Sequence, residues 1–162
     1  GTGMENHSKY GHFIYTHDGN KTLYVNLFTP SSLETDDFAV TQETQFPNQP
    51  TTTLTVGKAG QYTIAVRHPA WAGDAFSIAV NGSVLDGSAV KKGTASYVAI
   101  TRQWKKSDKV EITLPMELRY EACPNYEDYI AFKYGPILLA ANSTNGSEKL
   151  QNEYGGEGRM DH

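Results

Sequence analysis

Short segments in which apolar and polar residues alternate recur along most of the chain, and turn signals separate them. The expected strands are residues 22–28, 38–46, 52–56, 62–67, 76–80, 83–85, 96–101, 109–114, 129–134 and 137–141. A period of two places every second side chain on the same face of a sheet. Because no helical pattern separates these segments, they predict an all-β fold, an antiparallel β-sandwich of the jelly-roll-like kind.

One turn is predicted by residue type alone. Asn81 and Gly82 stand between two expected strands, 76–80 and 83–85. Both residues tolerate the positive φ angles of a type I′ turn, the turn that best matches the twist of two hairpin strands. We therefore expect these two strands to pair as a hairpin.

The N-terminal residues have a different pattern. Thr2 stands three residues before Glu5, the spacing of a helix capping box, and residues 4–15 are largely apolar or small. This predicts one helix over residues 1–16 that packs against polypeptide outside this chain. The expected division is therefore this helix, a β-sandwich over residues 17–142, and a polar tail over residues 143–162 that begins a further segment.

Charge and composition exclude several classes of function. The net charge is −4 at pH 7 and the basic residues are scattered, which argues against binding to nucleic acid. No apolar run is long enough to span a bilayer, so we expect no membrane partner. The single cysteine, Cys123, cannot form a disulfide or a multi-cysteine zinc site within the chain.

The search for catalytic or metal-binding residues finds none. His7, His12 and His17 are spaced by five residues, whereas two histidines that share a metal on one helix face are four apart. Nucleophile elbows and phosphate-binding glycine loops are missing from the sequence. Adjacent acids such as Glu127 and Asp128 are typical of solvated turns and do not make the facing carboxylate pair of a glycosidase.

Two tryptophans are candidates for stacking against a sugar ring. Trp71 follows His68-Pro69-Ala70 at the end of an expected strand, and Trp104 precedes Lys105-Lys106 in an expected hairpin turn. The alternative for each ring is to fold back and close one end of the sandwich, which is the commoner fate of a large aromatic side chain. The fold class does not decide between these roles.

Several separated motifs resemble one known family. They are Gly1-Thr2-Gly3-Met4-Glu5-Asn6-His7-Ser8-Lys9-Tyr10-Gly11, Leu23-Tyr24-Val25-Asn26-Leu27-Phe28, Thr41-Gln42 with Phe46-Pro47, Arg67-His68-Pro69-Ala70-Trp71, Leu114-Pro115-Met116, and Ala131-Phe132-Lys133-Tyr134-Gly135-Pro136. In this order they resemble the C-terminal half of bacterial β-L-arabinofuranosidases of glycoside hydrolase families 127 and 146. The motifs do not separate the two families, although the first run favours family 146.

The resemblance implies a parent enzyme whose active site lies in an (α/α)6 barrel, and it implies that the expected helix over residues 1–16 is the last helix of that barrel. It implies a retaining exo-glycosidase in which two adjacent cysteines just upstream of Gly1 hold a zinc ion, one of them is the nucleophile, and a glutamic acid is the acid/base. None of these groups corresponds to a residue of this chain, so no catalytic residue, metal ligand or cofactor is expected here. Glu5 and His7 are candidates only for an indirect role beside the active site.

Three roles remain for the chain. The first is a non-catalytic domain that buttresses the catalytic barrel of the same polypeptide; the alternatives are a carbohydrate-binding module for plant-type arabinose-containing glycans, and an oligomerisation domain. On this interpretation the isolated chain is inactive and zinc belongs to the parent. The sequence does not give the location, for which the expectation is a periplasmic or extracytoplasmic parent.

Overall fold

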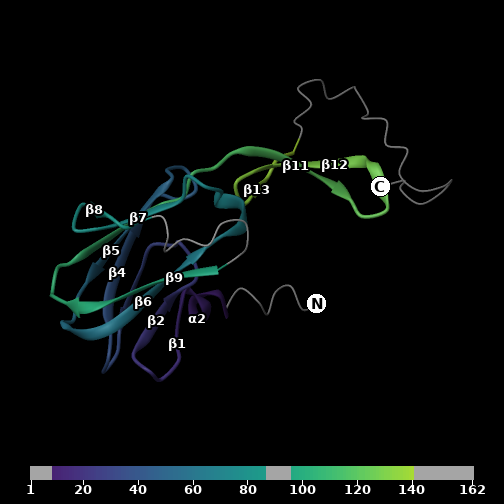
Figure 1. The fold of residues 1–162 in the computed structure, drawn as a ribbon. Helices are drawn as coiled ribbons and strands as arrows, with labels where there is room; N and C mark the ends of the chain where they lie inside the picture. Colours follow the sequence, from purple (N-terminus) through teal and green to yellow (C-terminus); the bar gives the residue numbers. More distant parts are fainter. Residues whose placement is uncertain (1–8, 87–95, 141–162) are drawn as a thin grey trace.

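The computed structural model describes residues 9–86 and 96–140, and in them two β-sheets lie face to face (Figure 1). The first sheet has the order β1-β2-β6-β9 and the second the order β3-β4-β5-β10-β7-β8. Their strands are β1 (Tyr15–His17), β2 (Thr22–Val25), β3 (Ser31–Glu34), β4 (Ala39–Thr44), β5 (Thr51–Val56), β6 (Gly60–His68), β7 (Ser77–Val80), β8 (Ser83–Val84), β9 (Ser96–Trp104) and β10 (Lys109–Thr113). The predicted all-β sandwich is confirmed.

The hydrophobic core lies between these two sheets. In β6 and β10 every second side chain, such as Ile64, Val66, Val110 and Ile112, is almost completely buried. The alternation seen in the sequence is therefore the alternation between the core face and the outer face of each sheet. Burial of this apolar surface is the main source of stability for a sandwich of this size.

The strand pairing is antiparallel in all the described pairs except one. β2 runs parallel to β6, with Leu23 opposite Ile64 and Val25 opposite Val66. Between these two strands the chain crosses to the other sheet and forms β3, β4 and β5 before it returns. A long connection of this kind is what a parallel pair requires.

The predicted hairpin at Asn81-Gly82 is present. Val80 pairs with Ser83, and the φ angles of Asn81 and Gly82 are 51° and 80°. Both are positive, as a type I′ turn requires. The Asn81 side chain also accepts a hydrogen bond from the backbone N–H of Lys109 at 2.8 Å, which ties the turn to β10.

The N-terminal helix is short in the described part of the chain. α2 (Tyr10–Ile14) ends at Ile14, and Tyr15, which was expected within the helix, begins β1. The capping box of Thr2 and Glu5 lies outside the described residues. The domain boundaries at residues 16 and 142 remain predictions, and the polar tail also lies outside the described residues.

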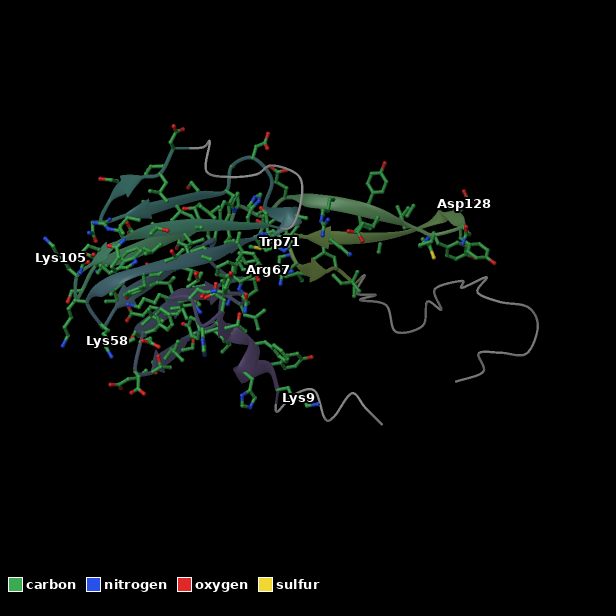
Figure 2. The ribbon with its side chains drawn as sticks, turned by 60° about the horizontal axis from the view of Figure 1, so that its bottom comes forward. Lys9, Lys58, Arg67, Trp71, Lys105 and Asp128 are labelled. Atoms are coloured by element: carbon green, nitrogen blue, oxygen red, sulfur yellow. The ribbon has the colours of Figure 1, made fainter. Side chains whose placement is uncertain are left out.

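A third sheet extends from one end of the sandwich (Figures 1 and 2). It contains β11 (Leu118–Cys123), β12 (Tyr126–Tyr134) and β13 (Ile137–Leu138) in the order β11-β12-β13. β12 and β13 were expected from the sequence, whereas β1, β3 and β11 were not. The backbone N–H of Gly135, in the β12–β13 turn, donates to the Glu117 carbonyl at 3.2 Å, so this sheet connects back to the segment that follows β10.

At the other end of the sandwich a buried carboxylate organises the β9–β10 hairpin. Asp108 accepts hydrogen bonds from the backbone N–H of Lys105 at 2.9 Å and from the Asn81 amide at 3.0 Å. These two donors, and then the charges of Arg102 and Lys105, lower the pKa of Asp108. Burial, together with the negative charge of Asp108, raises the pKa of Tyr62 nearby to about 12.

We predict that Asp108 makes the stability of the chain depend on pH. Its folded pKa is lowered, so its contribution is fully present above the unfolded pKa of about 4 and is lost as the pH falls through the folded value. Asp108→Asn should lower the melting temperature at pH 7, because one amide oxygen cannot accept from both donors. The difference in melting temperature between the unchanged protein and Asp108→Asn should become smaller towards pH 2. Glu111→Gln, on the exposed face of β10, is the control and should have nearly the melting temperature of the unchanged protein at both pH values. An equal gap at both pH values would contradict this.

Candidate functional site

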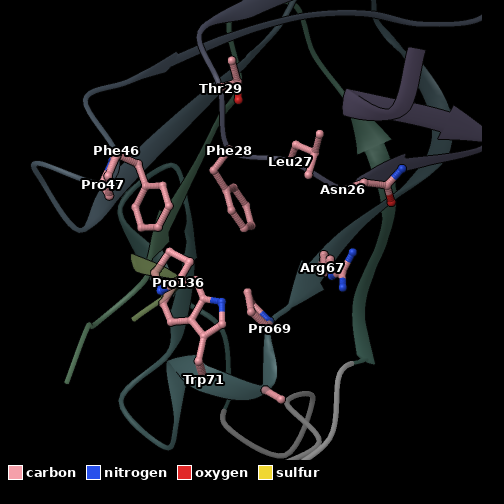
Figure 3. A pocket seen from close by; sticks show the side chains of 11 residues that line it. Asn26, Leu27, Phe28, Thr29, Phe46, Pro47, Arg67, Pro69, Trp71 and Pro136 are labelled. Carbon is pink, nitrogen blue, oxygen red and sulfur yellow. The ribbon is translucent and has the colours of Figure 1, made fainter. Parts of the chain in front are cut away.

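A groove of about 640 Å³ lies at the end of the sandwich from which the third sheet extends (Figure 3). We call it the Trp71 groove. It is lined by four separate segments: the chain after β2, the chain after β4, the end of β6 with the 3-10 helix η2 (Ala70–Ala72), and the β12–β13 turn. The lining residues are Asn26, Leu27, Phe28, Thr29, Phe46, Pro47, Arg67, Pro69, Ala70, Trp71 and Pro136.

Aromatic rings form one wall of the Trp71 groove. The rings of Phe46 and Trp71 are stacked, with centroids 5.8 Å apart and an interplanar angle of 15°. Phe28 meets Phe46 edge-on at 6.2 Å. Trp71 is half-buried and packs against the core, so one face of its ring is already occupied by Phe46. This wall is a preformed apolar surface.

Gln42 holds the segment that carries Phe28 in place. Its side chain is almost completely buried, and Nε2 donates to the carbonyls of Leu27 at 3.0 Å and Thr29 at 2.8 Å and approaches Ser31 Oγ at 3.3 Å. These bonds satisfy backbone groups that no strand partner reaches. The Gln42 amide therefore fixes the backbone of the groove wall through the core of the second sheet.

His68 does the same for the segment that carries Trp71. The His68 ring is completely buried, lies 4.4 Å from the Phe76 ring, and has Nε2 3.3 Å from the Gly73 carbonyl oxygen. Pro69 follows with an extended backbone and leads into η2, which presents Trp71. In the run Arg67-His68-Pro69-Ala70-Trp71, His68 lies in the core, whereas the other four residues line the groove.

The third sheet closes the groove from the remaining side. Gly135 has a φ of 55°, and a Cβ at this position would clash with the side chain of Met116. Only glycine allows the β12–β13 turn to lie so close to Met116. The next residue, Pro136, is thereby placed at the groove beside residues that precede it by more than sixty positions.

Arg67 is the one charged side chain among the described residues that line the groove (Figure 3). It is exposed, and among the described residues no ion pair or hydrogen bond is made by its side chain. An exposed guanidinium beside an apolar wall favours a ligand that combines apolar groups with a carboxylate. The groove holds no carboxylate of its own, so it has no acid pair for glycoside hydrolysis.

The N-terminal helix is anchored next to the Trp71 groove through Asn26. The backbone N–H of Asn26 donates to the Ile14 carbonyl at 2.9 Å, and its side chain bonds Thr16 Oγ1 at 3.1 Å and Tyr97 Oη at 2.6 Å. The Tyr15 hydroxyl oxygen lies 3.0 Å from Ser31 Oγ. Burial raises the pKa of Tyr15, which favours the neutral phenol. In contrast, Tyr10 and Phe13 of α2 are 55% and 56% exposed. The helix, which is tied to Asn26 at the rim of the groove, thus presents two large and largely exposed aromatic rings.

The two tryptophans that were candidates for sugar stacking differ in their exposure to solvent. Trp71 lies at the groove, whereas Trp104 is completely buried and its Nε1–H donates to the Tyr62 carbonyl at 3.0 Å. The expectation that Trp104 could stack on a sugar is therefore wrong for this structure, because no ring face is accessible. Glu5 and His7 lie outside the described residues.

The side chains that could bind a metal ion are dispersed in the described parts of the chain. Within residues 9–86 and 96–140 no three His, Cys, Asp or Glu side chains come together in a way that could hold a metal ion. Cys123 is exposed at the end of β11. No helix in the described residues has the length and apolar character needed to cross a membrane.

The segments that line the groove are the ones whose motifs carried the family resemblance. Leu27-Phe28, Phe46-Pro47, Arg67 to Trp71, and Gly135-Pro136 are far apart in the sequence and converge here. The sequence reasoning selected Trp71 but not Phe28, Phe46, Arg67 or Pro136 as site residues. The signal available was that each motif falls at the end of an expected strand, where loops of a sandwich gather.

Comparison with protein families gives two matches. The middle domain of GH127 β-L-arabinofuranosidases matches residues 22–116, which is more than half of the chain. A domain family of unknown function, DUF4986, matches residues 119–162. The boundary between the matches coincides with the start of the third sheet at Leu118. None of the curated proteins compared with the chain matches it significantly.

Solved structures of similar proteins agree with the first match. A GH127 β-L-arabinofuranosidase from Geobacillus stearothermophilus T6 is 29% identical with a TM-score of 0.68, and the match covers 82% of this chain and 22% of that one. A structure described as a glycoside hydrolase has 28% identity and a TM-score of 0.67 over 76% of this chain and 22% of its own. A GH127 β-arabinofuranosidase has 29% identity and a TM-score of 0.63 over 77% and 23%. The chain therefore spans less than a quarter of each of these proteins. Two of the three names specify family 127, whereas the first residues favoured family 146.

Proposed function

Since the chain belongs to the GH127 β-L-arabinofuranosidase family, whose middle domain it contains, we propose that it is the non-catalytic sandwich that buttresses the catalytic barrel of a retaining exo-acting β-L-arabinofuranosidase. In this proposal the barrel docks on the surface formed by α2 and the Trp71 groove. The sandwich then holds the last helix of the barrel, and through it the active site, in position.

The observation that carries the proposal is the position of α2. The helix is tied to the rim of the groove by the Asn26 N–H bond to Ile14, yet Tyr10 and Phe13 are more than half exposed. Large aromatic side chains that project from one short helix beside an apolar groove are typical of a surface covered by another domain. The chemistry of the groove favours an apolar segment of the barrel with a carboxylate that pairs with Arg67.

The zinc site implied by the family resemblance does not fit the residues described here. That site needs two adjacent cysteines, and Cys123 is the only cysteine of the chain. It is exposed on β11, and no metal-ligating partners gather around it among the described residues. We therefore assign no metal ligand and no step of hydrolysis to this chain.

Charge reversal at Arg67 in the full-length enzyme tests the docking proposal. A negative charge at the desolvated contact should weaken docking and lower activity, although Arg67 lies outside the catalytic site in this proposal. An enzyme with Arg67→Glu that keeps full activity and thermal stability would contradict docking at this groove.

A second candidate function is sugar binding in the Trp71 groove. The partly exposed Trp71 ring and the volume of the groove, about 640 Å³, favour this function. Two observations weigh against it. Phe46 occupies one face of the Trp71 ring, and both groups of the Asn26 amide are already bonded within the protein. Few groups remain to orient sugar hydroxyls.

We therefore predict that the chain binds arabinan and arabinogalactan no more tightly than the millimolar range, equivalent to about 4 kcal/mol. Isothermal titration calorimetry of the chain with each polysaccharide should show only heat of dilution. Trp71→Ala serves as the control. Saturable heat that this substitution abolishes would establish the sugar-binding function in place of the structural one.

A further inference from the structure

The turn between β7 and β8 contains a residue pair that is chemically prone to deamidation. In an Asn-Gly pair the glycine has no side chain to hinder its backbone nitrogen, which can attack the side-chain amide of the asparagine. Asn81 and Gly82 are both exposed, and a Cβ at Gly82 would meet no atom within 4 Å. The described residues around Gly82 therefore do not block this attack or the entry of water.

The reaction needs only water as a second reactant. The Gly82 nitrogen forms a bond to Asn81 Cγ, the bond from Cγ to Nδ2 breaks, and ammonia leaves with the proton that the Gly82 nitrogen gives up. Water then opens the resulting cyclic imide to aspartate or isoaspartate. The net change is the addition of water and the loss of ammonia.

The structure holds the Asn81 side chain in a way that opposes this reaction. Asn81 Oδ1 accepts a hydrogen bond from the Lys109 backbone N–H at 2.8 Å, and Nδ2 donates to Asp108 Oδ1 at 3.0 Å. We call these two bonds the Asn81 clamp. Because Nδ2 is the atom that leaves as ammonia, deamidation necessarily breaks its bond to Asp108. The clamp therefore stabilises the reactant.

The Asp108 carboxylate is a strong and fixed acceptor for this bond. Asp108 is only 8% exposed, and its Oδ2 accepts from the Lys105 backbone N–H at 2.9 Å. The hydrogen bonds from Lys105 and Asn81 lower the pKa of Asp108, so the group is ionised at neutral pH. A hydrogen bond to an ionised acceptor is about twice as strong as one between neutral groups. Release of the Asn81 amide is correspondingly unfavourable.

We infer that Asn81 is a modification site, at which Asp108 suppresses deamidation and conversion to aspartate separates the β7–β8 hairpin from the β9–β10 hairpin. In the product a carboxylate oxygen replaces the Nδ2 donor that lies 3.0 Å from Asp108 Oδ1. Two carboxylates at this distance repel each other, and Asp108 loses a donor that nothing replaces. The modification is irreversible, and it does not depend on how the Trp71 groove is used.

Deamidation rates in the chain of 162 residues test the first part of this inference. The unchanged chain and Asp108→Ala are incubated at mildly alkaline pH, at a temperature below both melting temperatures. Peptide mapping by mass spectrometry then measures aspartate and isoaspartate at position 81. Asp108→Ala should deamidate at least about tenfold faster, the factor that corresponds to one hydrogen bond to a charged group. Equal rates at position 81 would overturn the inference.

Val66→Ala separates release of the clamp from a general loss of stability. Val66 is completely buried in β6, in the other sheet, so its truncation lowers stability but changes no group of the clamp. Asn81 in this variant should deamidate at nearly the rate of the unchanged chain. If Val66→Ala accelerates the reaction as much as Asp108→Ala does, the inference is wrong. Should Asp108→Ala not fold, Asp108→Asn takes its place, because a neutral amide binds Asn81 more weakly than a carboxylate.

The product of the reaction can be examined directly with Asn81→Asp. This substitution should lower the melting temperature at pH 7 by about 4 °C or more, because it places two carboxylates together and removes a donor. Asn48→Asp makes the same chemical change at an exposed position between β4 and β5, and its melting temperature should be nearly unchanged. Equal melting temperatures for the two variants would contradict the proposed separation of the hairpins.

Discussion

Replacing Trp104 by alanine should lower the free energy of unfolding of the chain by about 3–5 kcal/mol, the usual cost of removing a fully buried tryptophan. The Trp104 side chain has no exposed surface, and its indole N–H is bonded to the Tyr62 carbonyl. The ring lies 6.0 Å from the Tyr62 ring, and the Arg102 guanidinium lies 5.3 Å from its centroid. Truncation leaves a cavity and an unpaired carbonyl together. Urea denaturation followed by circular dichroism measures the effect.

Trp71→Ala is the matched control, because it makes the same chemical change at a half-buried position. It should cost well under the Trp104 value, since much of the Trp71 ring already faces the groove. If the two substitutions lowered the free energy of unfolding equally, the burial of Trp104 would not explain its contribution to stability. The comparison separates a ring that belongs to the core from a ring that belongs to a surface.

Arg67→Glu in the full-length enzyme should reduce kcat/KM at least about tenfold and lower the melting temperature. If a carboxylate of the barrel pairs with Arg67, the substitution places two negative charges together at a desolvated contact, which costs about 2–5 kcal/mol. The last barrel helix would then lose its support, and the active site with it. Hydrolysis of a nitrophenyl β-L-arabinofuranoside and differential scanning calorimetry measure the two effects.

Two controls make this experiment specific. Lys106→Glu reverses a charge in the exposed β9–β10 hairpin, at the end of the sandwich marked by Lys105 in Figure 2, and should leave activity unchanged. In the chain of 162 residues, Arg67→Glu should change the free energy of unfolding by no more than about 0.5 kcal/mol, because Arg67 is exposed there. Equal losses of activity for both reversals would show that net charge, and not docking at the groove, is responsible.

The strands of the sandwich could be predicted because one face of each is buried. In β6 the core residues Tyr62, Ile64 and Val66 alternate with polar or small residues, and the sequence preserves this pattern. β3 is short, polar and follows a proline, so nothing in its four residues distinguishes it from a loop. β11 has no buried residue, and only its pairing with β12 makes it a strand.

The burial of Trp104 had a signal that was not used. Val98, Ile100, Arg102 and Trp104 alternate along β9, so the tryptophan shares the core face with Val98 and Ile100. Ending the expected strand at residue 101 removed Trp104 from that pattern. If the expected strand had been extended to residue 104, the alternation would have placed the Trp104 ring in the core.

The Trp71 groove could not be derived from the sequence in the same way. Its wall depends on the parallel pairing of β2 with β6 and on the approach of Pro136, and both are contacts between distant segments. Local periodicity gives the face of each strand but not the order of strands in a sheet. The family resemblance selected the right segments without indicating that they meet.

The most direct test of the central claim, that the residues that cleave the glycosidic bond lie outside this chain, is a turnover assay. The purified chain of 162 residues is incubated with a nitrophenyl β-L-arabinofuranoside, zinc and a reductant, and released L-arabinose is measured. The prediction is a rate equal to that of the protein-free control. Release of L-arabinose in proportion to the amount of chain, unchanged on further purification, would contradict the claim.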